Sequence, residues 1–329
     1  MDNYISIPQR TMNYPEPNEQ GWERRTLEKL AFAALEAQKK QHRWSVFFKA
    51  LGFAYLMVVL FAVVDWGVSP EHKERHTALV TLNGVIEAKG EANAEHLIAA
   101  LNAAFDEKNA VGVVLRINSP GGSPVQSGLV NDEIRRLRAK YPEKPLYVVI
   151  EDICASGGYF VAAAADKIYV NKASIVGSIG VLMDGFGFTG VMDKVGVERR
   201  LLTAGENKGF MDPFSPQVAG QKAHAQALLA DIHKQFIDVV RTGRGKRLKE
   251  TPEMFSGLMW TGAQSVEMGL ADDFGSIDSV ARDVIQAEKV LDYSVKDNIA
   301  ERFAKRLGAG AVQGFWKVLS ENAAFGGLR

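Results

Sequence analysis

The chain has 329 residues, and its 39 basic and 39 acidic side chains give a formal net charge of zero. Charged residues make up 24% and hydrophobic residues 47% of the sequence, which excludes a chain that is disordered throughout. The balanced charge gives no electrostatic sign of a nucleic-acid partner, which usually requires a basic surface. A single cysteine, Cys154, excludes an internal disulfide framework and a zinc site built on cysteines.

Residues 1–43 are predicted to form a cytoplasmic N-terminal segment. Its first 25 residues are polar and interrupted by prolines, whereas the apolar spacing over residues 26–40 predicts a short amphipathic helix. This helix would either bind a membrane surface or a partner helix, or simply extend the segment that follows it.

Residues 44–66 are predicted to form one membrane-spanning signal anchor. Residues 50–64 are apolar and uncharged, and with the aromatic residues before them the run reaches about 20 residues, the length that crosses a bilayer core. Basic residues precede the run and Asp65 follows it, so we expect a cytoplasmic N-terminus and a periplasmic domain, held at the inner membrane. A buried core helix is the alternative.

After a linker over residues 67–76, residues 77–296 are predicted to form one α/β domain, with a C-terminal helix or tail over 297–329. Apolar runs typical of buried strands alternate here with helical patterns, which predicts a parallel sheet with helices on its faces. Strands are expected at 78–86, 111–117, 146–150, 167–170, 199–203 and 290–295, and helices at 94–105, 125–140, 157–165 and 216–240.

Two of the predicted strands end in turns that are typical of catalytic sites. The second strand runs into a Pro-Gly-Gly turn, in which Gly121 and Gly122 can adopt positive φ and bring backbone N–H groups close to a ligand. The third leads through Ser156 and Gly157 into a helix, which would place Ser156 at the carboxyl edge of the sheet. Each turn also has a simpler explanation: a tight β–α connection for the glycines, and a helix N-cap for Ser156.

A serine nucleophile needs a base, and the sequence favours lysine for that role. None of the six histidines lies between residues 97 and 223, and His224 and His233 fall on different faces of the long helix, as surface residues do. Lysine is the other base that serine hydrolases use. Lys172, Lys194 and Lys208 are downstream candidates, and Lys208 lies in a glycine-flanked loop.

Six motifs occur in order along residues 77–290: INSPGG at 117–122, ASGGY at 155–159, ADKIY at 165–169, IVGSIGV at 175–181, TAGENKG at 203–209 and WTGAQSVEMGLAD at 260–272. With these motifs the chain resembles the signal peptide peptidase A family of serine peptidases, in the short single-domain form that includes SohB-like proteins. The resemblance implies a parallel α/β fold like those of ClpP and crotonase.

The resemblance also implies a Ser/Lys dyad, with Ser156 as the nucleophile and Lys208 as the base. It implies that Ser178 orients the lysine. The backbone N–H groups of Gly157, Gly121 and Gly122 are expected to hold the oxyanion.

The implied reaction is hydrolysis of released signal peptides, or other unfolded hydrophobic peptides, through an acyl-enzyme. A solvated lysine is protonated at neutral pH, so Lys208 has to be enclosed to act as a base. The resemblance implies that this happens at a subunit interface, in a homo-oligomer whose active sites are shared. No metal or other cofactor is expected, since the sequence carries none of the motifs that bind them. A non-catalytic membrane scaffold on a peptidase fold, and a crotonase-type acyl-CoA enzyme, are the alternative functions.

Overall fold

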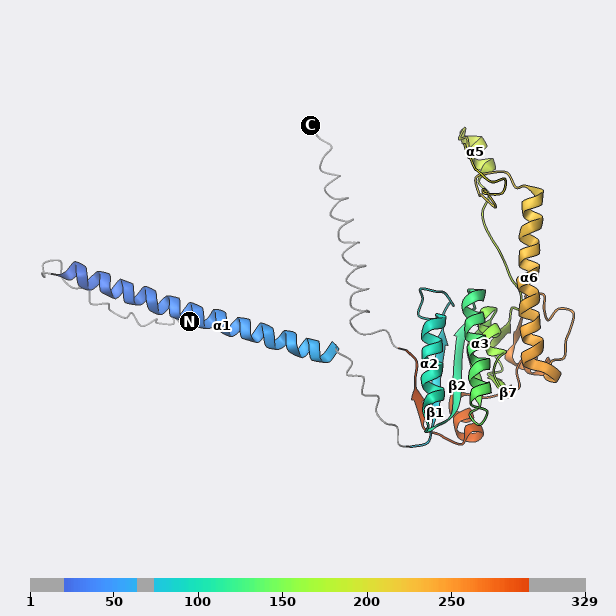
Figure 1. Cartoon of the computed structure of the whole chain (residues 1–329), viewed down its shortest axis with the longest axis horizontal. Helices are drawn as coiled ribbons and strands as arrows, with labels where there is room; N and C mark the ends of the chain where they lie inside the picture. The colour runs from blue at the N-terminus through green and yellow to red at the C-terminus, as the bar shows by residue number, and fades with distance from the viewer. Residues whose placement is uncertain (1–20, 64–73, 296–329) are drawn as a thin grey trace, which may run out of the picture. The chain divides into compact units, whose positions relative to one another are not determined.

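The computed structural model of the chain describes residues 21–63 and 74–295, which fall into two units. One unit contributes a single long helix, α1 (Trp22–Val63), and the other contributes all the remaining elements described (Figure 1). The helix expected over 26–40 is therefore part of a longer one. The structure does not confirm the span expected over 44–66: no helix in the described ranges is both long and apolar enough to cross a membrane, and residues 64–66 lie outside them.

A mainly parallel sheet organises the second unit, as the sequence predicts. In the described part of the chain it has eight strands, in the order β6-β5-β3-β2-β1-β8, with β4 paired to both β3 and β7. Only the β5–β6 pair is antiparallel. The strands are β1 (His76–Asn83), β2 (Ala110–Ser119), β3 (Leu146–Ala155), β4 (Lys167–Val170), β5 (Ile175–Gly177), β6 (Met259–Thr261), β7 (Asp273–Phe274) and β8 (Val290–Asp292).

The central strand β3 carries two partners on the same side. Residues 147–150 pair with β4, and residues 153–155 pair with β5. The division follows an irregularity in the β2–β3 ladder, where Ile117 pairs with Ile150 but Ser119 pairs with Cys154. As a result, the last residue of β3, Ala155, lies beside Gly177 at the end of β5.

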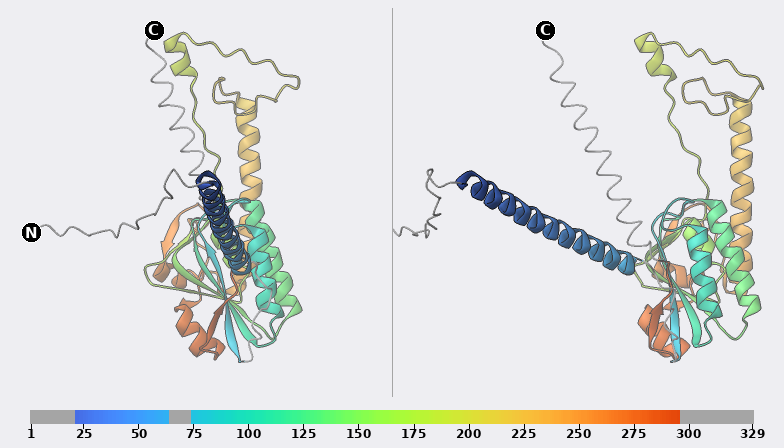
Figure 2. Two further views of the ribbon diagram at one scale, coloured as in Figure 1. Left: turned by 90° about the vertical axis from the view of Figure 1, so that its left-hand side faces the viewer. Right: turned by 60° about the vertical axis from the view of Figure 1, so that its left-hand side comes forward.

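Helices cover both faces of the sheet (Figure 2). The helices are α2 (Ala94–Asp106), α3 (Pro124–Lys140), α4 (Gly157–Ala162), α5 (Thr189–Val195), α6 (Ala219–Arg244), α7 (Gly262–Glu267) and α8 (Ile277–Ser279), with short turns η1 (Gly245–Arg247) and η2 (Val280–Ile285). The starts of α2 and α3 follow from their caps: Asn93 Oδ1 accepts from His96 N at 2.8 Å, and Ser123 precedes Pro124, which occupies the first turn of α3.

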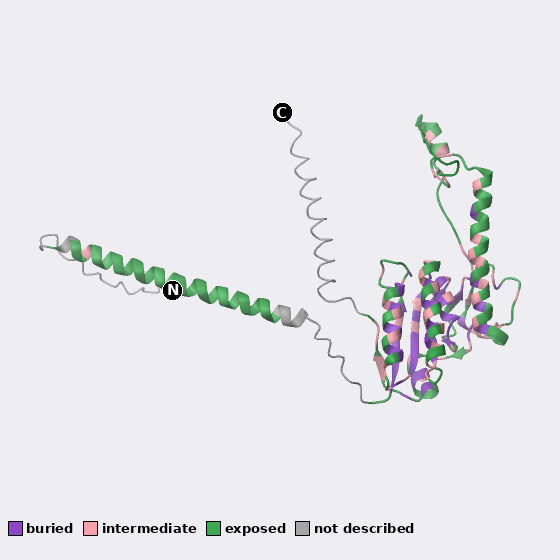
Figure 3. Ribbon diagram, viewed as in Figure 1, coloured by how far each residue is buried: buried purple, intermediate pink, exposed green. Residues whose placement is uncertain are grey.

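The main core lies between the sheet and helices α2, α3 and α4 (Figure 3). Leu82, Leu115 and Ile150 contribute to it from three neighbouring strands. A smaller cluster on the opposite face includes Val114 of β2 and Ile285 of η2. Neighbouring residues of a strand belong to opposite clusters, as Val114 and Leu115 of β2 do, so both faces of the strand are apolar. Such strands appear in the sequence as continuous apolar runs, which is why these runs predicted them.

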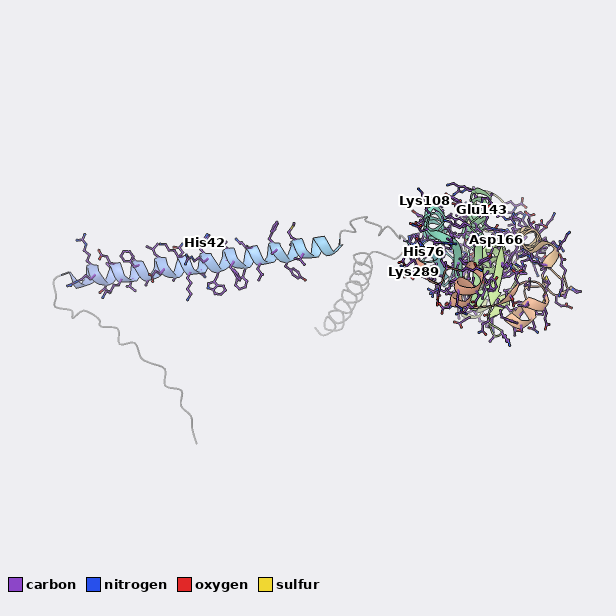
Figure 4. All side chains as sticks on the ribbon, turned by 90° about the horizontal axis from the view of Figure 1, so that it is seen from below. His42, His76, Lys108, Glu143, Asp166 and Lys289 are labelled. Carbon is purple, nitrogen blue, oxygen red and sulfur yellow. The ribbon has the colours of Figure 1, made fainter. Side chains whose placement is uncertain are left out.

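The two ends of this unit are joined by one strand pair. The start of β8 lies beside the start of β1, where Thr77 pairs with Val290 and Thr77 N donates to Lys289 O at 2.8 Å. His76 and Lys289 accordingly lie side by side (Figure 4).

The C-terminal end of α6 is fixed to the sheet domain by a buried ion pair and a close helix contact. Arg244 Nη1 lies 2.8 Å from Asp272 Oδ2, and the Arg244 side chain is fully buried. Asp272 Oδ2 also accepts from Ile168 N of β4 at 2.7 Å. A Cβ atom at Gly243 would lie 1.9 Å from Ala163 O, so only glycine permits this approach.

Residues 181–218, here called the arm, leave the sheet domain and return to it only through α6. The arm includes α5, which lies beyond the N-terminal end of α6 (Figures 1 and 2). The strand expected at 199–203 is wrong, because that segment has no neighbouring strand to bond with in the described structure. Its apolar side chains are exposed: Leu202, for example, is 96% exposed.

Candidate active site

Ser156 occupies a strained corner between β3 and α4. Its backbone has φ +50° and ψ −122°, a conformation that residues other than glycine rarely adopt. Ser156 N donates to Gly177 O at 2.8 Å, which holds the corner against the end of β5. Ser156 is the N-cap residue of α4, but its side chain makes no capping hydrogen bond, so capping does not engage the hydroxyl. The corner instead leaves a half-buried hydroxyl at the carboxyl edge of the sheet.

The Pro-Gly-Gly turn packs directly against this corner. Gly121 has φ +102° and Gly122 has φ +148°, both in the region that favours glycine. A Cβ at Gly121 would lie 2.7 Å from Gly157 N, and one at Gly122 would lie 2.1 Å from Ile86 O. The two glycines therefore allow two backbone segments to approach more closely than any side chain would permit.

Two backbone N–H groups at this contact are open to a ligand. Gly157 N, at the start of α4, and Gly122 N donate no hydrogen bond within the described residues. The two glycines face each other, since a Cβ at Gly157 would lie 3.2 Å from Gly122 N. By contrast, Gly121 N donates to Ser119 Oγ at 3.1 Å. Gly157 and Gly122 are thus the pair whose N–H groups can bind a developing negative charge.

Ser178 lies in the turn that follows β5. It also has positive φ, at +51°, and Ser178 N donates to Leu258 O at 2.8 Å. Like Ser156, Ser178 lines the same pocket, and neither hydroxyl forms a hydrogen bond within the part of the chain that the structure describes. The pairing of β3 with β5 is what brings the two serines to one place.

A largely apolar pocket opens beside Ser156. Its volume is about 1190 Å³, and it lies between the first turns of α3, the start of α4, residues 178–182 and the C-terminal half of α6. Phe160 and Phe236, whose ring centroids lie 5.2 Å apart, join α4 to α6 in its wall. Its apolar lining residues include Val125, Leu129, Phe160, Val181, Leu182, Ile232, Phe236 and Val239.

Lys208 does not line this pocket. It is exposed, in an arm loop whose neighbouring residue Asn207 accepts from Gln221 Nε2 at 3.3 Å. The pocket is lined by residues 232–239 of α6, and the eleven residues from Gln221 to Ile232 correspond to about 16 Å along the helix. A single chain therefore brings together Ser156, Ser178, Gly157 and Gly122, but not Lys208.

The structure adds residues that the sequence pattern does not single out. His233 is half-buried rather than on the surface, and its Nε2 lies 3.1 Å from Ile179 O, next to Ser178. Ile232 and Phe236 become pocket residues only because α6 packs beside α4. Their helical spacing in the sequence shows an apolar face, but not what that face covers.

Two other titratable groups near the corner are kept neutral. Burial raises the pKa of the Cys154 thiol, so this cysteine behaves as a small apolar side chain. Burial likewise raises the pKa of Tyr159, whose hydroxyl donates to Leu270 O at 2.8 Å. No cluster of three metal-ligating side chains occurs among the described residues.

Comparison with known proteins gives one family and several relatives. The family description "Peptidase family S49" matches residues 138–291. A Brucella melitensis protein named "Na(+)/H(+) antiporter NhaA" is 44% identical over 214 residues, which are 64% of this chain but only 29% of that protein. The chain thus spans under a third of that relative's length.

Two relatives of more similar length carry peptidase names. "Putative protease MJ0651" of Methanocaldococcus jannaschii is 30% identical over 63% of this chain and 67% of its own length. "Putative signal peptide peptidase SppA" of Enterococcus faecium is 29% identical over 66% of this chain and 64% of its own length. From these matches and the residues at the corner, the chain belongs to peptidase family S49, which confirms the resemblance predicted from its six motifs.

Proposed function

We propose that the protein is a serine peptidase in which Ser156 attacks the peptide bond and Lys208 of a neighbouring copy is the base. The observation that carries this proposal is the Ser156 corner: a strained serine, with the open N–H groups of Gly157 and Gly122 beside it, at the edge of an apolar pocket. A nucleophile, donors for an oxyanion and a substrate pocket are the parts that acyl transfer requires.

In the proposed reaction, the neutral amine of Lys208 takes the proton from Ser156 Oγ as this oxygen bonds to the scissile carbonyl carbon. The N–H groups of Gly157 and Gly122 stabilise the oxyanion of the tetrahedral intermediate. The C–N bond then breaks, and Lys208 returns the proton to the leaving amine. Water hydrolyses the acyl-enzyme by the same steps. Ser178 would accept or donate a hydrogen bond that orients the lysine, and Gly121 would shape the turn.

The exposed arm supports the part of this proposal that concerns a second subunit. Leu182 is 80% exposed, Phe186 81% and Leu202 96%, which is unusual for large apolar side chains outside an interface. Covering this arm with another copy would also remove Lys208 from water, and loss of water disfavours the ammonium form. We therefore propose a homo-oligomer whose active sites are shared between subunits.

Unfolded peptides, including released signal peptides, are the proposed substrates. Residues 180–182 line the pocket and belong to no strand of the described structure, so an extended peptide could pair with them. The apolar pocket would take one of its side chains.

We also propose that residues 44–66 anchor the protein in the inner membrane, with the peptidase domain in the periplasm. Consecutive apolar side chains of α1, among them Phe53, Tyr55 and Leu56, are exposed all around the helix, and lipid would cover them. Sodium carbonate extraction tests the anchor: the full chain should stay with the membrane pellet, and Leu56→Arg together with Val58→Arg should release it. A full chain that the extraction releases would contradict the anchor.

Mixing two inactive variants tests the shared site. Ser156→Ala and Lys208→Ala should each abolish cleavage of a fluorogenic peptide or a denatured protein. Oligomers reassembled from equal amounts of the two variants should regain about a quarter of the wild-type activity, because one interface in four would combine an intact serine with an intact lysine. No recovery in mixed oligomers of native size would refute the shared site, and full activity of either variant alone would refute the dyad.

A further inference from the structure

Among the described residues that line the pocket beside Ser156, one is charged, Asp132 of α3. This carboxylate is exposed and forms no hydrogen bond or ion pair within residues 21–63 and 74–295. Its neighbour Glu133, by contrast, accepts from Asn102 and pairs with Arg136 outside the pocket. Asp132 is therefore an uncompensated negative charge in a pocket that is otherwise uncharged.

Asp132 and Ser156 line different parts of the pocket. Eight residues separate it from Pro124 at the start of α3, which corresponds to about 12 Å along the helix. Asn131 Nδ2 donates to Phe160 O at 2.7 Å, which fixes this part of α3 at the level of Phe160, four residues beyond Ser156. The pocket therefore leads from the nucleophile, past an aromatic wall, to a carboxylate.

We propose that Asp132 makes this pocket select peptide side chains that combine an apolar stem with a cationic end, namely lysine and arginine. This inference rests on the proposed peptidase function and adds a specificity to it. The methylene stem would pack against Leu129 and Phe160, and the cationic group would donate charge-assisted hydrogen bonds to Asp132. Gln235, which also lines the pocket, offers a second acceptor. Acidic side chains would be excluded by the like charge.

The exposure of Asp132 determines how large the selection can be. Ion pairs that remain accessible to water contribute little, so we expect lysine to be favoured over an uncharged side chain of the same length by about fivefold in kcat/KM. The preference should fall as the ionic strength is raised, since salt screens accessible charges.

Matched peptides measure this selection in the assembled full-length protein. Two series carry either lysine or norleucine at one position, which is moved in turn through the residues flanking the cleaved bond. Norleucine keeps the apolar stem and lacks the charge. At the position that the pocket binds, Asp132→Asn should lower the lysine-to-norleucine ratio of kcat/KM about fivefold. Asp132→Lys should invert the preference, so that norleucine is cleaved faster than lysine at that position. Glu133→Gln removes one charge outside the pocket and should leave the ratio at its wild-type value.

The outcomes separate this inference from the proposed function. If the wild type cleaves both series and Asp132→Asn leaves every ratio unchanged, the inference is overturned and the peptidase function stands. The same holds if Asp132→Asn only lowers the mass of the oligomer, because the carboxylate then serves assembly. If the wild type cleaves neither series and behaves like Ser156→Ala, the peptidase function itself is overturned.

Discussion

The sheet domain and the arm differ in how far they bury their own apolar side chains. The strands and helices of the domain bury apolar faces in two clusters, and some of its glycines, such as Gly122 and Gly243, occupy positions where neighbouring backbone leaves no room for a side chain. The arm leaves large apolar side chains in water and has glycines, such as Gly185 and Gly190, with open space around them. The proposed nucleophile therefore lies in a domain that buries its own apolar faces, whereas the proposed base lies in a segment whose apolar side chains stay exposed in the single chain.

Helix α6 contains the boundary between the two regions. Its N-terminal half, next to the arm, has one buried side chain, Ala225, whereas its C-terminal half buries Phe236, Val240 and Arg244. Substitutions in the two halves should therefore have different consequences, and the following predictions test that difference.

The buried ion pair should give the largest effect on stability. Arg244→Met leaves the carboxylate of Asp272 without its buried partner, and we expect a loss of about 3 kcal/mol in the free energy of unfolding. Arg241→Ala, one turn earlier, removes an exposed pair with Glu250 and should cost at most about 1 kcal/mol. Urea unfolding of the sheet domain, followed by near-UV circular dichroism, measures both. Equal losses would mean that α6 is not anchored at Arg244.

Two glycines of the same helix give a second matched pair. A Cβ at Gly243 would collide with Ala163 O, so Gly243→Ala should cost about 2 kcal/mol. Gly220 has open space around it, so Gly220→Ala should stabilise the helix, by up to about 1 kcal/mol. The same unfolding measurement applies. A destabilising Gly220→Ala would show that the first turn of α6 is packed in a way that the single chain does not reveal.

Acid should weaken the sheet domain through Asp272. Burial alone would raise the pKa of this carboxyl, but the hydrogen bonds from Arg244 and Ile168 N and the positive charges of Arg244 and Arg247 together outweigh burial, so that its pKa lies below the usual value. The folded state therefore favours the carboxylate, and the resulting stability is present above the unfolded pKa of about 3.9 and is lost as pH falls below it. Urea midpoints between about pH 6 and pH 3 should fall less steeply in Asp272→Asn. If the urea midpoints of Asp272→Asn and of the wild type fell equally steeply with pH, Asp272 would be excluded as a source of the acid sensitivity.

The arm should show the smallest effect on stability and a separate effect on assembly. Leu202→Ser changes a side chain that contacts almost nothing in the single chain, so the unfolding free energy should shift by no more than about 0.5 kcal/mol. Sedimentation velocity should nevertheless show smaller particles, with a matching loss of peptidase activity. A large loss of stability would mean that the arm folds onto its own domain.

The parts of the fold that local pattern determines could be predicted. The strand at 167–170 has the predicted bounds, and β1 and β2 lie within three residues of theirs, because each follows an apolar run. β3 begins at residue 146 as predicted but extends to Ala155, past the apolar run that ends at Ile150. The strand expected at 199–203 shows where such reasoning fails. Its apolar residues have the right composition, but a strand also requires a neighbour, and local composition does not contain that information.

The candidate site likewise has features that the sequence predicts and features that it does not. Ser156, Gly157 and Gly122 converge because the carboxyl ends of neighbouring parallel strands share one edge, which the strand order allows one to expect. The sequence does not reveal that Gly121 N is already engaged by Ser119, since this depends on a side-chain rotamer. Asp132 looks like any surface charge on α3 until α6 is placed across from it.

The pairing of β1 with β8 sets the order in which the domain can be completed. β1 opens the domain in the chain and lies inside the sheet, yet one of its two neighbours is made of residues 290–292. During synthesis this flank of β1 has unsatisfied backbone groups until more than two hundred further residues have been added. A nascent chain therefore exposes a ready template for mispairing, and a truncation that removes residues 290–292 would leave that edge open permanently.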